Sequence, residues 1–178
     1  PKVLDYGSGA GTWAKAAQIL GEDITAYEPH MTRVGHLGYK VIQDINQLNE
    51  KSYDLILLNQ VLEHAIDPVN ELKQIKLLSN KDSILVSGVP NANSISHKEF
   101  IRTWPYSKKS HLMAPFQHLH GFCQRSFLKA HNNAGFRYFY TDQIYGIKNF
   151  LKFSMVEFAT LFGISISTHF VFRPFNNE

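Results

Sequence analysis

Three glycines at alternate positions, Gly7, Gly9 and Gly11, follow the apolar run "KVLDY" near the start of the chain. Because glycine has no Cβ atom, it lets the backbone turn sharply and lets a ligand approach the main chain closely. A helical pattern starts at Thr12, so the free amides of a helix N-terminus would lie beside this turn. The combination predicts a ligand-binding turn between a strand and a helix, with tight packing alone as the alternative.

An acidic residue, Glu28, ends the second apolar run "DITAY", about 20 residues beyond the glycines. A carboxylate at this place in nucleotide-binding α/β proteins accepts hydrogen bonds from ribose hydroxyls. The glycine spacing is G-x-G-x-G, however, and Thr12 stands where the third glycine of the dinucleotide fingerprint would fall. The spacing therefore disfavours NAD and favours another nucleotide-type ligand.

Strand-like and helix-like segments alternate along the chain. The predicted strands are 2–7, 23–29, 39–45, 53–60, 82–91, 137–146 and 167–174, and the predicted helices are 12–21, 67–78, 124–136 and 149–162. This alternation predicts an α/β doubly wound fold, in which ligands bind beyond the carboxyl ends of the strands. Segment 92–122 is irregular and long for a connection, so we expect a functional lid or insertion there.

The composition is that of one soluble globular domain, with 178 residues, 44% of them hydrophobic and 19% charged. No stretch is apolar enough for a membrane span, and the single cysteine, Cys123, excludes an internal disulfide framework and fits a cytoplasmic location. The net positive charge lies in the second half, where segment 97–111 interleaves aromatic and basic residues. We interpret this segment either as a solvated loop or as a contact for an anionic ligand, and it is too dilute for nucleic acid.

Four segments, in order, resemble class I S-adenosylmethionine-dependent methyltransferases. "LDYGSGAG" resembles their D/E-x-G-x-G-x-G loop, and "ITAYEP" resembles their ribose-binding strand end. "NQVLEHAIDP" (59–68) is similar to the segment after the fourth strand in the small-molecule branch, which includes ubiquinone-type and methyltransferase-23-like enzymes. "PFQHLHGFCQRSFLKAHNNAGF" (115–136) is similar to the His-Leu-x-x-Phe stretch and Ala-Gly-Phe helix end of many members.

The resemblance implies a Rossmann-like sheet of seven strands, mostly parallel, with an antiparallel last strand and helices on both faces. It covers nearly the whole chain, so we expect residues 1–178 to form one methyltransferase domain with segment 92–122 on the acceptor side. Members normally have at least one helix before the first strand. We therefore expect N-terminal elements that this sequence does not include.

The resemblance also implies S-adenosylmethionine as the cofactor, with S-adenosylhomocysteine as its product. Asp5 and the backbone from Gly7 to Gly11 would position the methionine part, and Glu28 would accept from both ribose hydroxyls. Asp44 would accept from the adenine amino group, unless it is an ordinary turn residue. The full predicted set is Asp5, Tyr6, Gly7, Ser8, Gly9, Gly11, Glu28, Pro29, Asp44, Ile45, Asn59 and Gln60, with Ile45 flanking adenine and the last two lining the cofactor beneath the methyl group.

Three histidines on the expected acceptor side, His64, His118 and His120, are the candidate catalytic residues, since histidine is the natural base near neutral pH. His118 and His120 alternate in "QHLHGF", so an extended segment would point both in the same direction. We favour this pair for acceptor contact or base duty. For His64, capping or packing is the alternative.

A metal site is not expected from the sequence. The spacing of His111, His118 and His120 comes with no cysteine partner and no H-E-x-x-H arrangement. Metal-assisted methyl transfer to catechols typically uses an acidic pair near the fourth strand, where this chain has Asn59 and Gln60. We therefore do not expect Mg²⁺.

The absence of two motifs narrows the class of molecule that could accept the methyl group. "NQVL" stands where enzymes acting on exocyclic amino groups have Asn/Asp-Pro-Pro-Tyr, and Phe122 precedes Cys123 where cytosine C5 enzymes have Pro-Cys. We expect in-line methyl transfer to O, N or C of a small molecule such as a sugar, a quinone-like ring, or a lipid-linked or polyketide-type intermediate. The alternatives are a non-catalytic cofactor-binding or interaction module and an NAD-linked oxidoreductase. Helix 149–162 is interpreted as core packing, with an acceptor pocket or a homodimer face as alternatives.

Overall fold

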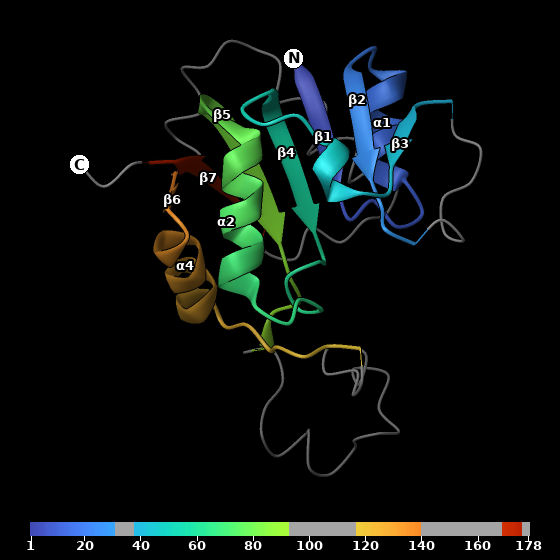
Figure 1. The fold of residues 1–178 in the computed structure, drawn as a ribbon. Helices are drawn as coiled ribbons and strands as arrows, with labels where there is room; N and C mark the ends of the chain where they lie inside the picture. The colour runs from blue at the N-terminus through green and yellow to red at the C-terminus, as the bar shows by residue number, and fades with distance from the viewer. Residues whose placement is uncertain (31–37, 93–116, 140–168, 176–178) are drawn as a thin grey trace.

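The computed structural model of the chain describes residues 1–30, 38–92, 117–139 and 169–175 (Figure 1). The predicted helix 149–162, His111 and most of segment 92–122 lie outside these ranges. Seven strands form one sheet in the order β3-β2-β1-β4-β5-β7-β6. The strands are β1 (Lys2–Tyr6), β2 (Asp23–Tyr27), β3 (Lys40–Ile42), β4 (Tyr53–Asn59), β5 (Ser79–Gly88), β6 (Phe136–Tyr138) and β7 (His169–Pro174).

The strand directions confirm the predicted fold class. β1, β2, β3, β4 and β5 pair in parallel, whereas β7 runs antiparallel to both β5 and β6. The order reverses at β1, because the chain proceeds outward from β1 to β3 on one side and through β4 and β5 on the other. Such a switch point leaves a crevice at the carboxyl ends of the two central strands.

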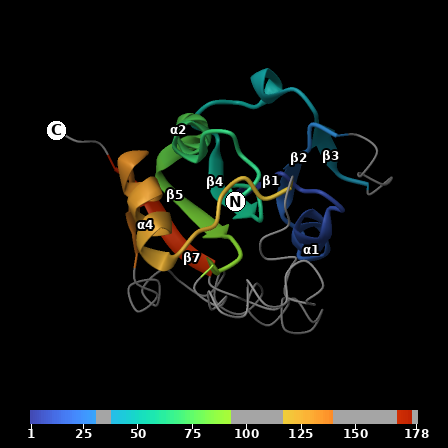
Figure 2. The same cartoon turned by 90° about the horizontal axis from the view of Figure 1, so that it is seen from below.

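Helices cover both faces of the sheet. Helix α1 (Thr12–Ile19) packs on one face through Ala14 and Ala17, against alternate strand residues that include Val3 and Leu55. Helices α2 (Pro68–Leu78) and α4 (Gln124–Asn133) pack on the other face, against the strand residues of opposite parity. Figure 2, viewed along the sheet, shows α1 on one side and α2 with α4 on the other. Because β1 and β4 send their helices to opposite faces, the loops that follow them separate and open the crevice between them.

The elements differ from prediction mainly at their ends. β5 starts three residues before the predicted Asp82, because Ser79 pairs with Tyr53 ahead of a local bulge. Within that bulge the amide of Asn80 donates to Ser83 Oγ at 2.7 Å, so its polar residues join the strand instead of forming a turn. β3 ends at Ile42, where the chain turns into a short 3₁₀ helix, η2 (Ile45–Gln47). No helix within the described ranges is long and apolar enough to cross a membrane.

The carboxyl end of the sheet is joined to segment 117–122 by backbone contacts. The amide of Ala92 donates to the carbonyl of Phe122 at 2.8 Å, and Asn91 forms an isolated parallel bridge with Phe122. Closer to the crevice, the carbonyl of Glu63 accepts the amides of Leu119 (2.7 Å) and His120 (3.1 Å). The loop after β4 and segment 117–122 are thus held side by side.

Candidate active site

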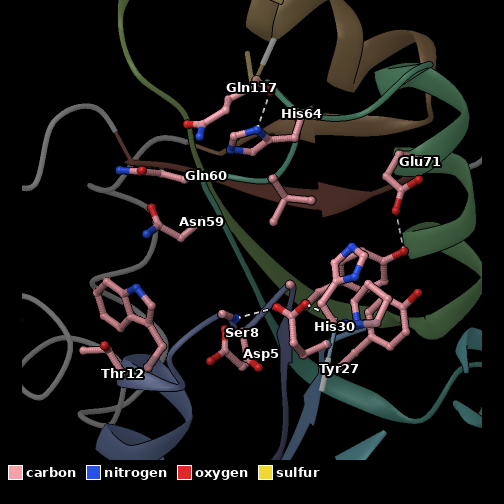
Figure 3. A pocket seen from close by; sticks show the side chains of 17 residues that line it. Asp5, Ser8, Thr12, Tyr27, His30, Asn59, Gln60, His64, Glu71 and Gln117 are labelled. Atoms are coloured by element: carbon pink, nitrogen blue, oxygen red, sulfur yellow. Dashed lines mark hydrogen bonds between the residues drawn. The ribbon is translucent and has the colours of Figure 1, made fainter. Parts of the chain in front are cut away.

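A cavity of about 760 Å³ lies at the carboxyl ends of β1, β2 and β4. Figure 3 shows Asp5, Ser8 and Thr12 at one end of it, Asn59 and Gln60 in the middle, and His64 with Gln117 at the far end. Of the predicted cofactor residues, those that line it are Asp5, Tyr6, Gly7, Ser8, Gly9, Glu28, Pro29, Asn59 and Gln60. Gly11, Asp44 and Ile45 are not among its lining residues.

The backbone amides of the glycine loop donate within the protein. The carbonyl of Tyr27 accepts the amides of both Gly7 (2.8 Å) and Ser8 (3.0 Å), and the carbonyl of Ser8 accepts the amide of Gly11 at 2.7 Å. The side chain of Glu28 accepts the amide of Gly9 at 2.7 Å. These four amides are therefore not a free cluster of donors of the kind that binds a pyrophosphate.

Two glycines of the loop have positive φ, a conformation that favours glycine, but they differ in the space around them. Gly7 has φ +72°, and a Cβ atom placed on it would lie 2.5 Å from Val61 Cγ2. Gly9 has φ +53°, and a Cβ atom placed on it would meet no atom within 4 Å. Gly7 therefore allows the loops after β1 and β4 to approach each other, whereas Gly9 leaves open space beside the cavity.

Asp5 connects the glycine loop to the helix behind it. Its carboxylate is 3% exposed, and its Oδ2 atom accepts the amide of Ala14, in the first turn of α1, at 2.9 Å. Burial raises the pKa of Asp5 from 3.8 to about 7, with a smaller contribution from the charge of Glu28, although the Ala14 amide opposes the shift. The side chain thus caps the helix while it lines the cavity.

Glu28 is 6% exposed and lies at the cavity wall. Its Oε2 atom accepts the amide of Gly9, and its Oε1 atom accepts the amide of His30 at 3.0 Å. Asp44 is exposed and serves as the N-cap of η2, accepting the amide of Asn46 at 3.0 Å. This is the turn role that the sequence left open for Asp44. Its predicted contact with adenine stays a prediction.

Tyr6, which was predicted from the sequence, lies in an aromatic and acidic wall of the cavity with two residues that were not predicted, Tyr27 and Glu71. The hydroxyl of Tyr6 donates to Glu71 Oε1 at 2.5 Å, and the Tyr6 and Tyr27 rings lie 4.7 Å apart. Burial, followed by the negative charges of Glu71, Asp44 and Glu28, raises the pKa of Tyr27. Glu71 comes from α2, and no local pattern relates it to a tyrosine of β1. Together with Asp5 and Glu28 it makes the described lining acidic, since that lining contains no lysine or arginine.

Of the candidate catalytic histidines, His64 lies at the opposite end of the cavity, and His118 and His120 lie on the segment beside it. The rings of His64 and His118 meet edge to face, 4.8 Å apart, and the amide of His120 donates to the backbone of the same loop. His118 and His120 are both half-buried, whereas Leu119 between them is 56% exposed. Of the three, only His64 is among the cavity's lining residues.

Another residue missed by the sequence analysis, Glu63, lies beneath these histidines. Its side chain is 1% exposed, and neither carboxylate oxygen has a hydrogen-bond partner in the part of the chain that the structure describes. Burial raises the pKa of Glu63 from 4.5 to about 7. The signal available in the sequence was an acidic residue four positions after Asn59, the end of β4, and directly after the apolar pair Val61 and Leu62.

Comparison with known proteins places these features in a family. The model of a family described as a methyltransferase domain matches residues 1–140. No curated protein matched the sequence.

Several solved structures share the fold. A methyltransferase from Archaeoglobus fulgidus, described as dependent on S-adenosylmethionine, is 16% identical (TM-score 0.60) over 76% of this chain and 61% of its own length. The 1,6-didemethyltoxoflavin-N1-methyltransferase of Burkholderia thailandensis, solved with 1,6-didemethyltoxoflavin and S-adenosylhomocysteine, is 18% identical (TM-score 0.56) over 78% of this chain and 61% of its own. A structure of the complex between the Haloferax volcanii Trm112 methyltransferase activator and the putative methyltransferase is 13% identical (TM-score 0.63) over 98% of this chain and 83% of the matched chain. The chain thus spans 61% of the length of the first two relatives.

The buried carboxyl of Asp5 predicts a specific dependence of stability on pH. Below pH 3.8, the ordinary pKa of an aspartate, Asp5 is protonated in both the folded and the unfolded chain. Between pH 3.8 and about pH 7, Asp5 is ionised in the unfolded chain and still protonated in the folded chain. The free energy of unfolding therefore falls through this group as the pH rises across that interval. The Asp5→Asn variant keeps an acceptor for the amide of Ala14. Its melting temperature should fall less than that of the parent when the pH is raised from about 5 to about 8.

The control for this comparison is Asp82→Asn, which removes an exposed carboxylate and should keep the parent's pH dependence. Thermal unfolding followed by circular dichroism at both pH values measures the difference. Equal pH dependence in Asp5→Asn and the parent would contradict the burial of a charge at Asp5.

Proposed function

The chain belongs to the methyltransferase-domain family, and on that basis we propose that it transfers the methyl group of S-adenosylmethionine to a small-molecule acceptor. The observation that carries the proposal is the acidic cavity closed by the glycine loop and Glu28. When bound, the cofactor supplies an electrophilic methyl group on a positively charged sulfur. The acidic lining suits a cationic ligand of this kind.

The residues of the cavity fit this cofactor better than they fit NAD. A pyrophosphate needs free amides or cationic side chains, but the loop amides are bound internally and the described lining has no lysine or arginine. Gly9 supplies open space beside the loop, and Ser8 Oγ is a buried hydroxyl with no hydrogen-bond partner among the residues that the structure describes. Both features support a ligand that lies against the glycine loop.

Individual roles follow from where the side chains lie. Glu28 would hold the ribose hydroxyls, because its carboxylate is buried at the carboxyl end of β2 and faces the cavity. Asn59 and Gln60, between the glycine loop and His64, would line the cofactor near the reacting group (Figure 3). Gln60 has φ 55°, a conformation that non-glycine residues rarely adopt and that recurs at functional sites.

The acceptor would lie at the histidine end of the cavity, beside His64, His118 and His120. These side chains would contact the acceptor and prepare its nucleophilic atom for in-line attack. A small acceptor is supported by the Burkholderia relative, whose structure contains 1,6-didemethyltoxoflavin. The anionic character of the acceptor and the cytoplasmic location stay predictions.

The first test is calorimetric titration of the purified chain with S-adenosylhomocysteine, with NAD⁺ as the matched ligand. We expect binding of the first and none of the second. Glu28→Ala should weaken the binding at least about tenfold, because hydrogen bonds to a charged group contribute roughly 1.5–3 kcal/mol each. Glu50→Ala, at an exposed acidic residue away from the cavity, should leave the affinity unchanged.

Binding of NAD⁺ in place of S-adenosylhomocysteine would overturn the proposal. Unchanged affinity in a folded Glu28→Ala variant would contradict the ribose assignment alone.

Gly9 allows a sharper test of where the cofactor lies, because the chain contains a matched glycine. Gly9 and Gly21 both have positive φ, and a Cβ atom on either meets nothing within 4 Å. Gly9→Ala and Gly21→Ala should therefore each cost about 1 kcal/mol of stability, measured by urea unfolding. Only Gly9→Ala should also weaken S-adenosylhomocysteine binding, and equal affinities in the two variants would place the ligand elsewhere.

The acceptor-side histidines are tested once a screen for S-adenosylhomocysteine release has found an acceptor. His118→Ala and His120→Ala should each lower turnover at least about tenfold, in the range typical for loss of an acid-base or positioning group. Their affinity for S-adenosylhomocysteine should change much less, because neither residue lines the cavity beside the glycine loop. A parallel loss of turnover and cofactor affinity would instead indicate a structural role.

A further inference from the structure

We propose that Glu63, His64 and His118 form a binding site for a divalent transition-metal ion at the acceptor end of the cavity. One ligand atom from each of the three side chains lies within 4.8 Å of the others. The residues come from two segments, the loop after β4 and segment 117–122, that backbone hydrogen bonds hold together. Their juxtaposition is therefore built into the fold.

The first argument is the condition of Glu63. Its carboxylate is 1% exposed, and both oxygens are without a hydrogen-bond partner among the described residues. Buried carboxylates are normally paired, hydrogen-bonded or bound to a metal, because an isolated buried charge is costly. The His64 ring lies beside this carboxylate, but the His64 Nε2 atom is 4.0 Å from Glu63 Oε1, beyond hydrogen-bonding distance. A cation between them would satisfy this carboxylate.

The second argument is the orientation of His64. Its Nδ1 atom lies 2.6 Å from the carbonyl oxygen of Gln117, as Figure 3 shows. A carbonyl can only accept, so Nδ1 carries the proton and Nε2 keeps a lone pair on the side of Glu63. Metal-binding histidines almost always donate their other ring nitrogen to a carbonyl or carboxylate in this way. The second imidazole, that of His118, meets the His64 ring edge to face.

The donor set indicates which cations fit. Two imidazoles and one carboxylate suit zinc, manganese, iron or cobalt, whereas magnesium and calcium prefer oxygen donors. Three protein ligands also leave at least one coordination position open. No metal site was expected from the sequence. That expectation considered the spacing of His111, His118 and His120, but not Glu63 or His64.

The use of the cation rests on the proposed function, although its binding does not. His64 lines the same cavity as the glycine loop, so the open coordination position would face the acceptor. An acceptor hydroxyl bound there would have a lowered pKa and would release its proton to solvent. The site therefore points to an acceptor that offers an oxygen atom.

The experiment uses the untagged chain, freed of metal with a chelator, and titrates it with Co²⁺ followed by visible absorption and with Zn²⁺ followed by calorimetry. We expect one site for each ion and much weaker binding of Mg²⁺. Glu63→Gln, which keeps the size of the side chain, and His118→Ala should each weaken binding at least about tenfold. His120→Ala, on the same segment but outside the cluster, should retain the parent's affinity.

Every sample is also titrated with S-adenosylhomocysteine and checked by circular dichroism, so that loss of folding is recognised. A folded chain that binds S-adenosylhomocysteine but neither metal overturns the metal site and leaves the proposed function standing. Metal binding that survives in both Glu63→Gln and His118→Ala also overturns it. If the chain binds metal at this site but no S-adenosylhomocysteine, the proposed function fails while the metal site is upheld.

Discussion

The carbonyl oxygen of Tyr27 is the point on which the geometry of the site depends. It accepts the amides of both Gly7 and Ser8, and it thereby joins the end of β2 to the loop that follows β1. Next to it, Glu28 accepts the amide of Gly9 and Asp5 accepts that of Ala14. Three acceptors from the ends of two adjacent parallel strands thus fix the glycine loop and the start of α1. The direction in which the loop faces the cavity follows from this strand register.

Because acceptors at the end of β2 bind the amides of Gly7, Ser8 and Gly9, the charge of the cavity is set by side chains. Asp5, Glu28 and Glu71 surround the cavity with carboxyl groups, and the aromatic rings of Tyr6 and Tyr27 lie between them. A fold often associated with phosphate binding at helix N-termini is here adapted to a positively charged ligand. At the other end the lining changes to the imidazole of His64 and the amide of Gln117. The two ends of one cavity are therefore chemically distinct, as transfer between two different molecules requires.

Local pattern was sufficient for the fold class and for most of the predicted residues that line the glycine-loop end of the cavity. Apolar runs that stop at Gly7 and Pro29 marked strand ends, and parallel strands bring such ends to one edge of the sheet. The acceptor side depended on contacts between distant segments. Glu63 is 55 residues from His118 in the sequence, and no periodicity predicts that the two meet. Glu71 likewise reaches Tyr6 across 65 residues. The bulge at the start of β5 escaped prediction because its polar residues are typical of a turn.

The bridge between Asn91 and Phe122 has a consequence for the evolution of the domain. Both ends of the intervening stretch are fastened to the sheet at one place, with Ala92 and Phe122 joined by a backbone hydrogen bond. The entropy of closing such a loop grows only slowly with its length, so insertions and deletions between these anchors cost the rest of the domain little. Changes in the length of this stretch would leave the glycine-loop end of the cavity in place, because that end is built from residues at the ends of β1 and β2.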